Sequence, residues 1–206
     1  SPAELACLER LVYFNECSGK SEKLIFWNEN EDFPSLGIGH FIWYPKDKQG
    51  PYRESFPELV AFLKMNGVEI PLGLENGLPW RDREEFQKSL QSAPMTSLRD
   101  LLEQTRALQV QFIVQRMEQA LPKILELAPA DERVFIKKKF YLVEGTPMGM
   151  LAMIDYVNFK GEGISIAERL QGQGWGLLQV LEEMSIPSDG ADALAEFVRA
   201  AEQVLE

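Results

Sequence analysis

Two short stretches near the start of the chain decide what its sequence predicts: Asn15-Glu16-Cys17-Ser18-Gly19 and Ser35-Leu36-Gly37-Ile38-Gly39-His40-Phe41. Apolar residues precede Glu16 at spacings of three, four and four, which predicts a helix over residues 3–18 with Glu16 on its apolar face. Gly19 fits the position that ends such a helix. A carboxylate at the end of an apolar stripe is unusual, because charged side chains normally occupy the solvated face.

The second stretch predicts half of a β-hairpin. Residues 24–27 and 36–44 have the β-branched and aromatic content of strands, and residues 28–34 form a polar turn between them. The rest of the chain predicts helices and loops. Helices are expected over 57–65, 83–92, a region capped by Thr96 or Ser97 with a turn or kink at Pro122, 131–143, 147–159, 177–184 and 189–205, with a loop over 161–176. We therefore expect an α+β, mostly helical fold in a single domain of residues 1–206, with a small hairpin lobe at about 20–50.

Composition limits the classes of function. The chain has 206 residues and a net charge of −11, which argues against general nucleic-acid binding. The basic run 137–139 is typical of a solvated helix face. No apolar run approaches the roughly 18 residues of a membrane span. No signal peptide is visible, although the first residue, Ser1, is compatible with a processed or trimmed chain.

Cysteine and histidine are scarce. Cys7 and Cys17 lie ten residues apart, which is about 15 Å on one helix. A disulfide needs Cα atoms within roughly 7 Å, so we expect two free thiols. With one histidine and no Cys-x-x-Cys pair, we expect no metal site, and nothing in the sequence indicates a cofactor.

Glu16 is the strongest candidate for catalysis. Burial of a carboxyl group keeps its proton on at neutral pH, and cleavage of a glycosidic bond requires such a proton donor. The alternative is a glutamate bonded to the backbone or to Lys20. The two glycines before His40 leave room for close approach by a backbone or ligand. A lone histidine among apolar residues is otherwise a satisfied core group.

A second motif lies near the C-terminus. Residues 170–179 combine three glycines with Gln171, Gln173 and Trp175, and Asn158 ends the helix before them. Tryptophan stacks on sugar rings and amides bond to sugar hydroxyls, so these residues are candidates for glycan binding. A tight loop that caps a helix explains the same pattern without a ligand.

The order of Glu16, strand 24–27 and the Ser-Leu-Gly-Ile-Gly-His stretch resembles the start of the phage-type lysozymes, in which a similar Thr-Ile-Gly-Ile-Gly-His strand follows the catalytic glutamate. Residues 152–161 resemble a later helix of that family. The resemblance implies a lysozyme-like fold, Glu16 as the general acid and Ser35 in place of the threonine that positions water. It places Asn28 where the family has an aspartate, so either a nearby carboxylate substitutes or Glu16 acts alone, as a single glutamate does in the lysozyme-like lytic transglycosylases. The candidates for that carboxylate are Glu29, Glu31 and Asp32.

The expected function is cleavage of a β-1,4-linked amino-sugar polymer, with peptidoglycan as substrate. Further contacts with the polymer are expected from His40, Trp43, Tyr44, Asn158, Gln171, Gln173 and Trp175. Three alternatives remain: a glycan-binding module without catalysis, a chitosanase-like hydrolase that the negative charge suits, and a helical interaction protein. A periplasmic or cell-envelope location follows only from the substrate. We expect a monomer.

Overall fold

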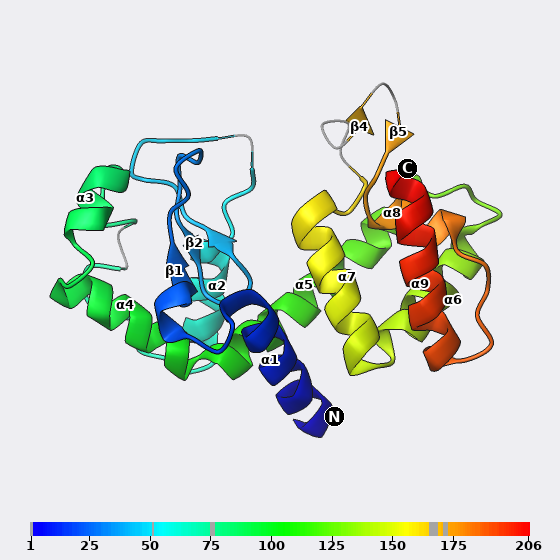
Figure 1. The fold of residues 1–206 in the computed structure, drawn as a ribbon, viewed down its shortest axis with the longest axis horizontal. Coiled ribbons are helices and arrows are strands. Elements are labelled where there is room, and N and C mark those ends of the chain that lie inside the picture. Colours follow the sequence, from blue (N-terminus) through cyan, green and yellow to red (C-terminus); the bar gives the residue numbers. More distant parts are fainter. Residues whose placement is uncertain (1, 51, 75–76, 165–168, 171–172) are drawn as a thin grey trace. The chain divides into compact units, whose positions relative to one another are not determined.

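The computed structural model describes residues 2–50, 52–74, 77–164, 169–170 and 173–206 (Figure 1). The described chain is mostly helical with a small three-stranded antiparallel sheet, which confirms the α+β prediction. It forms two compact units, one of residues 9–112 and one of residues 1–8 with 113–206. The sequence had predicted one domain with a hairpin lobe at about 20–50. In the structure, the hairpin region is only one part of the unit of residues 9–112.

The unit of residues 9–112 contains the sheet. Its elements are most of α1 (Pro2–Cys17), the 3-10 helix η1 (Ser21–Leu24), β1 (Ile25–Phe26), β2 (Ser35–Leu36), β3 (Phe41–Ile42), α2 (Phe56–Met65), α3 (Arg83–Lys88), α4 (Ala93–Gln104) and the start of α5 (Arg106–Leu127). The strands lie in the order β1-β2-β3, with Phe26 opposite Ser35 and Ser35 opposite Ile42.

The predicted strand over residues 36–44 is wrong. The chain leaves β2 after Leu36, makes a turn through residues 37–40 and returns as β3. Gly37 and His40 have φ values of +71° and +47°, which are incompatible with extended backbone. Likewise, residues 21–24 form a 3-10 helix, so the first strand begins at Ile25 rather than at Leu24.

Aromatic side chains build the core of this unit. Trp27 and Trp80 both pack edge-on against Phe86, and Trp43 stacks on Phe56. All five side chains are buried. Each removes a large apolar area from water, so they supply much of the free energy that holds short strands and helices together.

Several helix boundaries differ from the prediction, and the helix predicted over 83–92 ends at Lys88 as α3. The cap of α4 is Ser92, whose hydroxyl accepts a hydrogen bond from the Met95 N–H, and not Thr96 or Ser97. The pair Ala93–Pro94 then begins the helix, where proline is favoured because its missing N–H is not needed. Pro122 lies inside α5 rather than at the start of a new turn.

The other unit is built from the C-terminal helices. They are α6 (Arg133–Glu144), α7 (Pro147–Lys160), α8 (Leu177–Glu183) and α9 (Gly190–Leu205), with the two-stranded ribbon β4 (Arg169–Leu170) and β5 (Gln173–Gly174). Helix α9 packs against the other three helices. The buried Lys139 ammonium donates hydrogen bonds to the carbonyl groups of Leu181 and Glu182 at the end of α8, and burial lowers the pKa of Lys139.

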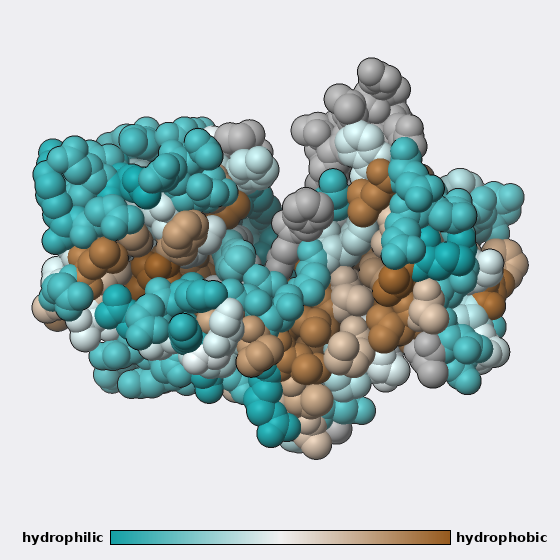
Figure 2. Space-filling view, in the orientation of Figure 1, coloured by the Kyte–Doolittle hydropathy of each residue, from teal (hydrophilic) through white to brown (hydrophobic). Residues whose placement is uncertain are grey.

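Hydrophilic residues cover most of the face shown in Figure 2. None of the helices in the described ranges is both long enough and apolar enough to cross a membrane.

Candidate active site

Glu16 lies in the last turn of α1. Val12 and Leu8, one and two turns earlier, are buried, and the Glu16 side chain on the same face is only 14% exposed. The helix ends in left-handed backbone at Ser18 and Gly19. Burial is the main reason that the pKa of the neighbouring Cys17 thiol rises to about 11, and the Glu16 carboxylate raises it further. Cys17 therefore stays a thiol at neutral pH, and both cysteines are free.

The turn between β2 and β3 presents His40 to Glu16. The two side chains are paired, with His40 Nε2 3.2 Å from Glu16 Oε2. The left-handed conformation of His40 is uncommon for a residue with a side chain, and such conformations gather at functional sites. Asn15 Nδ2 also lies 3.5 Å from Glu16 Oε1.

Gln109, on α5, forms a side-chain hydrogen bond with the backbone of this turn. Its side chain is fully buried, accepts a hydrogen bond from the Ile38 N–H at 3.0 Å and donates one to the Leu102 carbonyl at 2.7 Å. A Cβ atom at Gly37 would overlap the Gln109 side-chain oxygen. Glycine is therefore needed at position 37 both for its φ and for this close approach.

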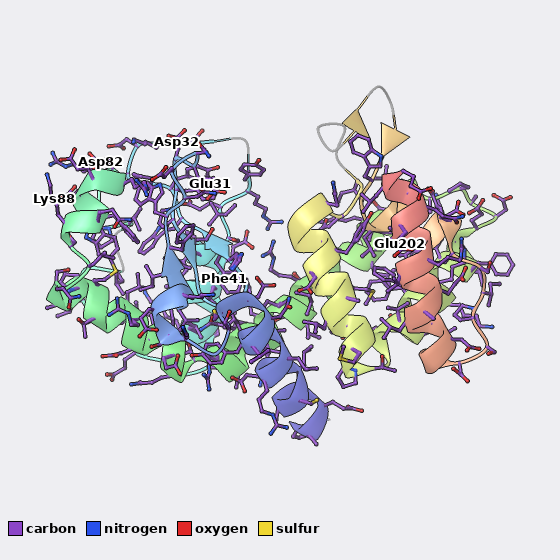
Figure 3. All side chains as sticks on the ribbon, in the orientation of Figure 1. Glu31, Asp32, Phe41, Asp82, Lys88 and Glu202 are labelled. Atoms are coloured by element: carbon purple, nitrogen blue, oxygen red, sulfur yellow. The ribbon has the colours of Figure 1, made fainter. Side chains whose placement is uncertain are left out.

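The loop between β1 and β2 carries the candidate second carboxylates, and Glu31 and Asp32 project from it (Figure 3). Trp27 Nε1 donates a hydrogen bond to the Glu31 carbonyl at 2.8 Å, which fixes the loop on the buried indole. Glu29 instead pairs with Arg83 on α3, at 3.3 Å between Arg83 Nη2 and Glu29 Oε1. The three acids of this loop therefore have different neighbours.

A cavity of about 470 Å³ opens where these segments meet. Its lining brings together Glu16, Ser35 and His40 with Glu31 from the loop. The full lining is Glu16, Glu22, Lys23, Phe26, Asn28, Glu31, Ser35 and His40. Glu29 and Asp32 are exposed and are not among these residues.

Other predicted contacts lie elsewhere. Trp43 and Tyr44 are buried and line a different cavity of the same unit. Trp175 belongs to the C-terminal unit, is half-buried, and its carbonyl accepts a hydrogen bond from the Tyr156 hydroxyl at 2.7 Å. Asn158 lies in the last turn of α7 and Gln173 lies in β5 of that unit, while Gln171 lies outside the described residues. Their roles in glycan binding stay predictions.

Several residues of this site were not predicted from the sequence: Glu22, Lys23 and Phe26, which line the cavity, and Gln109, which supports the turn. Phe26 lines the cavity with 59% of its surface exposed, directly opposite Ser35 in the sheet. The available signal for Phe26 was its position next to Ile25 in a strand. Alternate strand residues face opposite sides, so a buried Ile25 leaves Phe26 exposed. Gln109 carried no signal, because its partner Ile38 is 71 positions away in sequence.

The part of the chain that the structure describes contains no group of three or more His, Cys, Asp or Glu side chains suited to hold a metal ion. This arrangement suits acid–base chemistry, because a partly buried carboxyl group and a second carboxylate line the same cavity.

Comparison with family models, curated proteins and solved structures found no match to this chain.

Proposed function

We propose that this chain has a lysozyme-like fold and cleaves a β-1,4-linked amino-sugar polymer, with peptidoglycan as the expected substrate. One observation carries the proposal: Glu16 is largely buried, pairs with His40, and shares a cavity with Glu31. Glycosidases work with such a pair of carboxyl groups, one of which donates a proton to the leaving oxygen. The resemblance of residues 5–44 to phage-type lysozymes supports the same assignment.

In the proposed mechanism, Glu16 protonates the glycosidic oxygen. A sugar bound in the cavity excludes water from Glu16, which favours the protonated form. A charged His40 would favour the ionised form, so His40 is neutral in the productive complex. Glu31 then activates water or attacks the sugar, and Ser35 orients the water. The exposed ring of Phe26 stacks on a sugar face, and the Asn28 amide bonds to sugar hydroxyls.

The test is product analysis of purified peptidoglycan treated with the wild type, Glu16→Gln and Glu31→Gln. Loss of a general acid or base slows such reactions on the order of 10²–10⁴-fold, and we expect losses of that size in both variants. Glu29→Gln is the matched control, because Glu29 pairs with Arg83 outside the cavity, and its activity should stay within about twofold of wild type. Equal activity of wild type and Glu16→Gln would refute the proposal.

The anomer formed first by the wild type assigns the role of Glu31. Inversion means that Glu31 acts as a base on water, since the two carboxyl groups are then about 6.5–9.5 Å apart. Retention means that Glu31 attacks the sugar, with a separation of about 5–5.5 Å. Anhydro-sugar products mean that Glu16 alone carries the reaction, as in lytic transglycosylases.

A second candidate is a chitosanase-like hydrolase. The cavity is lined by Glu16, Glu22 and Glu31 against one lysine, Lys23, which favours a cationic polymer over an anionic one. Chitosan assayed in parallel decides between them, because only this candidate predicts faster cleavage of chitosan than of peptidoglycan.

A third candidate is a glycan-binding module without catalysis. Asn28 lines the cavity at the position where the resemblance expects an aspartate, and an amide cannot accept the proton that a carboxylate accepts. This candidate predicts that sugar fragments bind with equal affinity to wild type and Glu16→Gln and that neither yields products.

A further inference from the structure

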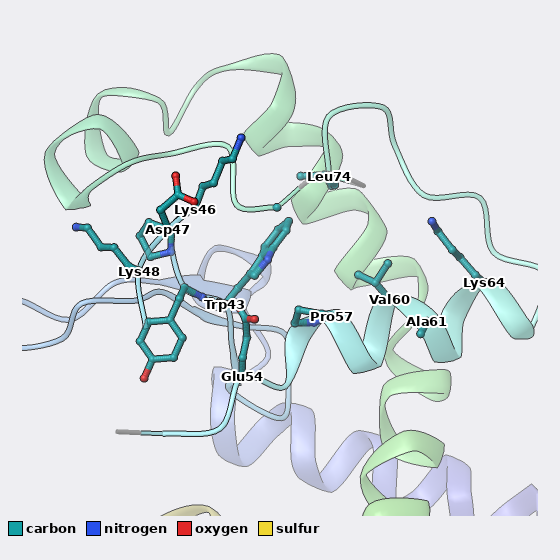
Figure 4. A pocket seen from close by; sticks show the side chains of 13 residues that line it. Trp43, Lys46, Asp47, Lys48, Glu54, Pro57, Val60, Ala61, Lys64 and Leu74 are labelled. Atoms are coloured by element: carbon teal, nitrogen blue, oxygen red, sulfur yellow. Dashed lines mark hydrogen bonds between the residues drawn. The ribbon is translucent and has the colours of Figure 1, made fainter. Parts of the chain in front are cut away.

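A second cavity, of about 440 Å³, lies in the unit of residues 9–112 and has no part in the proposed cleavage (Figure 4). Its volume falls in the range of small-molecule sites. Apolar groups form its walls and lysines stand at its rim. The wall residues include Trp43, Pro57, Val60, Ala61 and Leu74, and the rim lysines are Lys46, Lys48 and Lys64.

The walls are fixed before any ligand arrives. The Trp43 ring stacks on Phe56, with 4.6 Å between ring centroids. The Tyr44 N–H donates a hydrogen bond to the Glu54 carboxylate at 2.8 Å. A backbone bridge joins Pro45, which lines the cavity, to Leu78. Preformed walls lower the entropy cost of binding, because little has to be ordered when the ligand enters.

The charges at the rim favour an anion. Lys46 and Lys64 rise on opposite sides of the Trp43 ring, and Lys48 extends away from it (Figure 4). Within the described residues, neither Lys46 nor Lys48 forms an ion pair. This is a local concentration of lysines in a chain whose net charge is −11.

Two acids also line the cavity, and they differ in how strongly they should repel a bound anion. The Glu54 carboxylate already accepts the Tyr44 N–H, so part of its charge is satisfied by the backbone. Asp47 lies beside Lys46 in left-handed backbone, with φ +66°. Asp47 is therefore the acid at the rim that should weaken binding of an anion.

We propose that this cavity is a second binding site, for a ligand that joins a carboxylate to an apolar or sugar-ring body. The body lies against Trp43 and Val60, and Lys46 and Lys64 bind the carboxylate. Two sources have this chemistry: a sugar that carries an acidic substituent, and a free aromatic or acyl carboxylate. The site does not depend on the proposed cleavage, because it shares no lining residue with the cavity of Glu16.

The two cavities are nevertheless close along the chain. His40 lines the first and Trp43 the second, and three residues of backbone span at most about 11 Å. One polymer with acidic substituents could thus contact both cavities.

The experiment is titration of the full chain with N-acetylmuramic acid, N-acetylglucosamine and phenylacetate, followed by the NMR signal of the Trp43 indole N–H. Trp43→Phe identifies that signal. The titration is repeated in Glu16→Gln, which should respond like wild type at Trp43, so failure of the cleavage proposal does not affect the result.

We expect N-acetylmuramic acid to shift the Trp43 signal with at least about fivefold higher affinity than N-acetylglucosamine, which has the same ring without the carboxylate. The double variant Lys46→Met/Lys64→Met should lose about 5- to 10-fold in affinity, and Lys48→Met should lose less than about twofold. Asp47→Asn should bind about two- to threefold more tightly, because asparagine keeps the left-handed backbone and removes the charge.

Binding of phenylacetate with the same dependence on Lys46 and Lys64 supports the proposal and identifies a free carboxylate as the ligand. Its failure beside successful binding of N-acetylmuramic acid supports a sugar-borne carboxylate. Equal affinity for the two sugars, no response at Trp43, or equal losses in Lys48→Met and the double variant would overturn the proposal.

Discussion

At the scale of single residues, the pairing of Glu16 with His40 is the feature with the most chemical content. Lysine 20 was the partner that sequence spacing suggested, but the short contact in the structure is to the histidine, which comes 24 positions later. The partner decides which protonation states are available, since histidine changes charge near neutral pH and lysine does not. Because the two side chains lie 3.2 Å apart, a charge on one of them affects the protonation of the other.

This coupling gives a prediction for the pH profile. A charged His40 favours the ionised form of Glu16, which cannot donate a proton. In His40→Asn that cation is absent, so at acid pH, where His40 is charged in the wild type, more of Glu16 stays protonated and kcat should rise, whereas at alkaline pH, where His40 is neutral, the two proteins should agree. Asparagine suits the positive φ of position 40, which limits damage to the turn. Measurement of kcat against pH in both proteins checks this, and equal kcat values on the acid side would contradict it.

At the scale of elements, the turn between β2 and β3 is held by a side chain from a distant helix. The backbone contact within the turn is long, 3.4 Å between the His40 N–H and the Gly37 carbonyl, and the Gly37 N–H donates a hydrogen bond to the Leu24 carbonyl at 2.7 Å. Gln109 supplies the missing acceptor for Ile38, and its amide is satisfied at the Leu102 carbonyl and the Thr105 hydroxyl. A fully satisfied buried network of this kind fixes one conformation.

Gly37→Ala tests this arrangement, with Gly19→Ala as its control. Both glycines have similar φ values, +71° and +67°, so left-handed strain should lower the free energy of unfolding of both variants by about 1–2 kcal/mol. Only at Gly37 does the added Cβ displace Gln109, because nothing lies within 4 Å of a Cβ at Gly19. We expect Gly37→Ala to lose a further 1–3 kcal/mol, roughly the cost of unpairing a buried hydrogen bond.

Urea unfolding of both variants and of wild type measures the difference. Equal destabilisation of the two variants would show that the contact between Gly37 and Gln109 does not contribute to stability.

Elements with local signals were predictable from sequence, and this turn was not. The helices after residue 130 begin and end within a few residues of their predicted bounds, because apolar spacing and caps such as Thr146 are local. The Gly-Ile-Gly-His stretch was predicted as a strand because its composition is that of one. Its conformation is set by Gln109, and no local pattern reports a contact over 71 positions.

The candidate site shows the same division. Glu16, Ser35 and His40 were found because the first helix and the glycine stretch are recognisable in sequence, and the structure places all three in one cavity. The choice among Glu29, Glu31 and Asp32 was not possible, because it depends on how Trp27 and Arg83 hold the loop. The Asn28 position and its acidic neighbours gave only the set of candidates.

At the scale of the whole molecule, each of the two compact units has its own buried core. Trp27, Trp43 and Trp80 belong to the unit of residues 9–112, and Trp175 belongs to the other. Separate cores allow separate cooperative transitions, so unfolding need not be two-state.

The variant Trp175→Phe allows the unfolding of the unit of residues 9–112 to be followed by its own tryptophans. In that variant the fluorescence reports only the unit of residues 9–112, while far-UV circular dichroism also reports helices α6 to α9. We expect the two signals to give different urea midpoints. Coincident midpoints would mean that the chain unfolds as one cooperative body.

The pairing of His40 with Glu16 has a practical consequence, because His40 is the only histidine in the chain. Its imidazole therefore gives a single, self-assigned set of ring resonances in a spectrum of the unlabelled protein. The chemical shift of those resonances follows the charge on one side chain that touches the candidate acid. Natural abundance thus provides a spectroscopic reporter inside the site, and it reads out ligand binding and proton transfer there without any engineered probe.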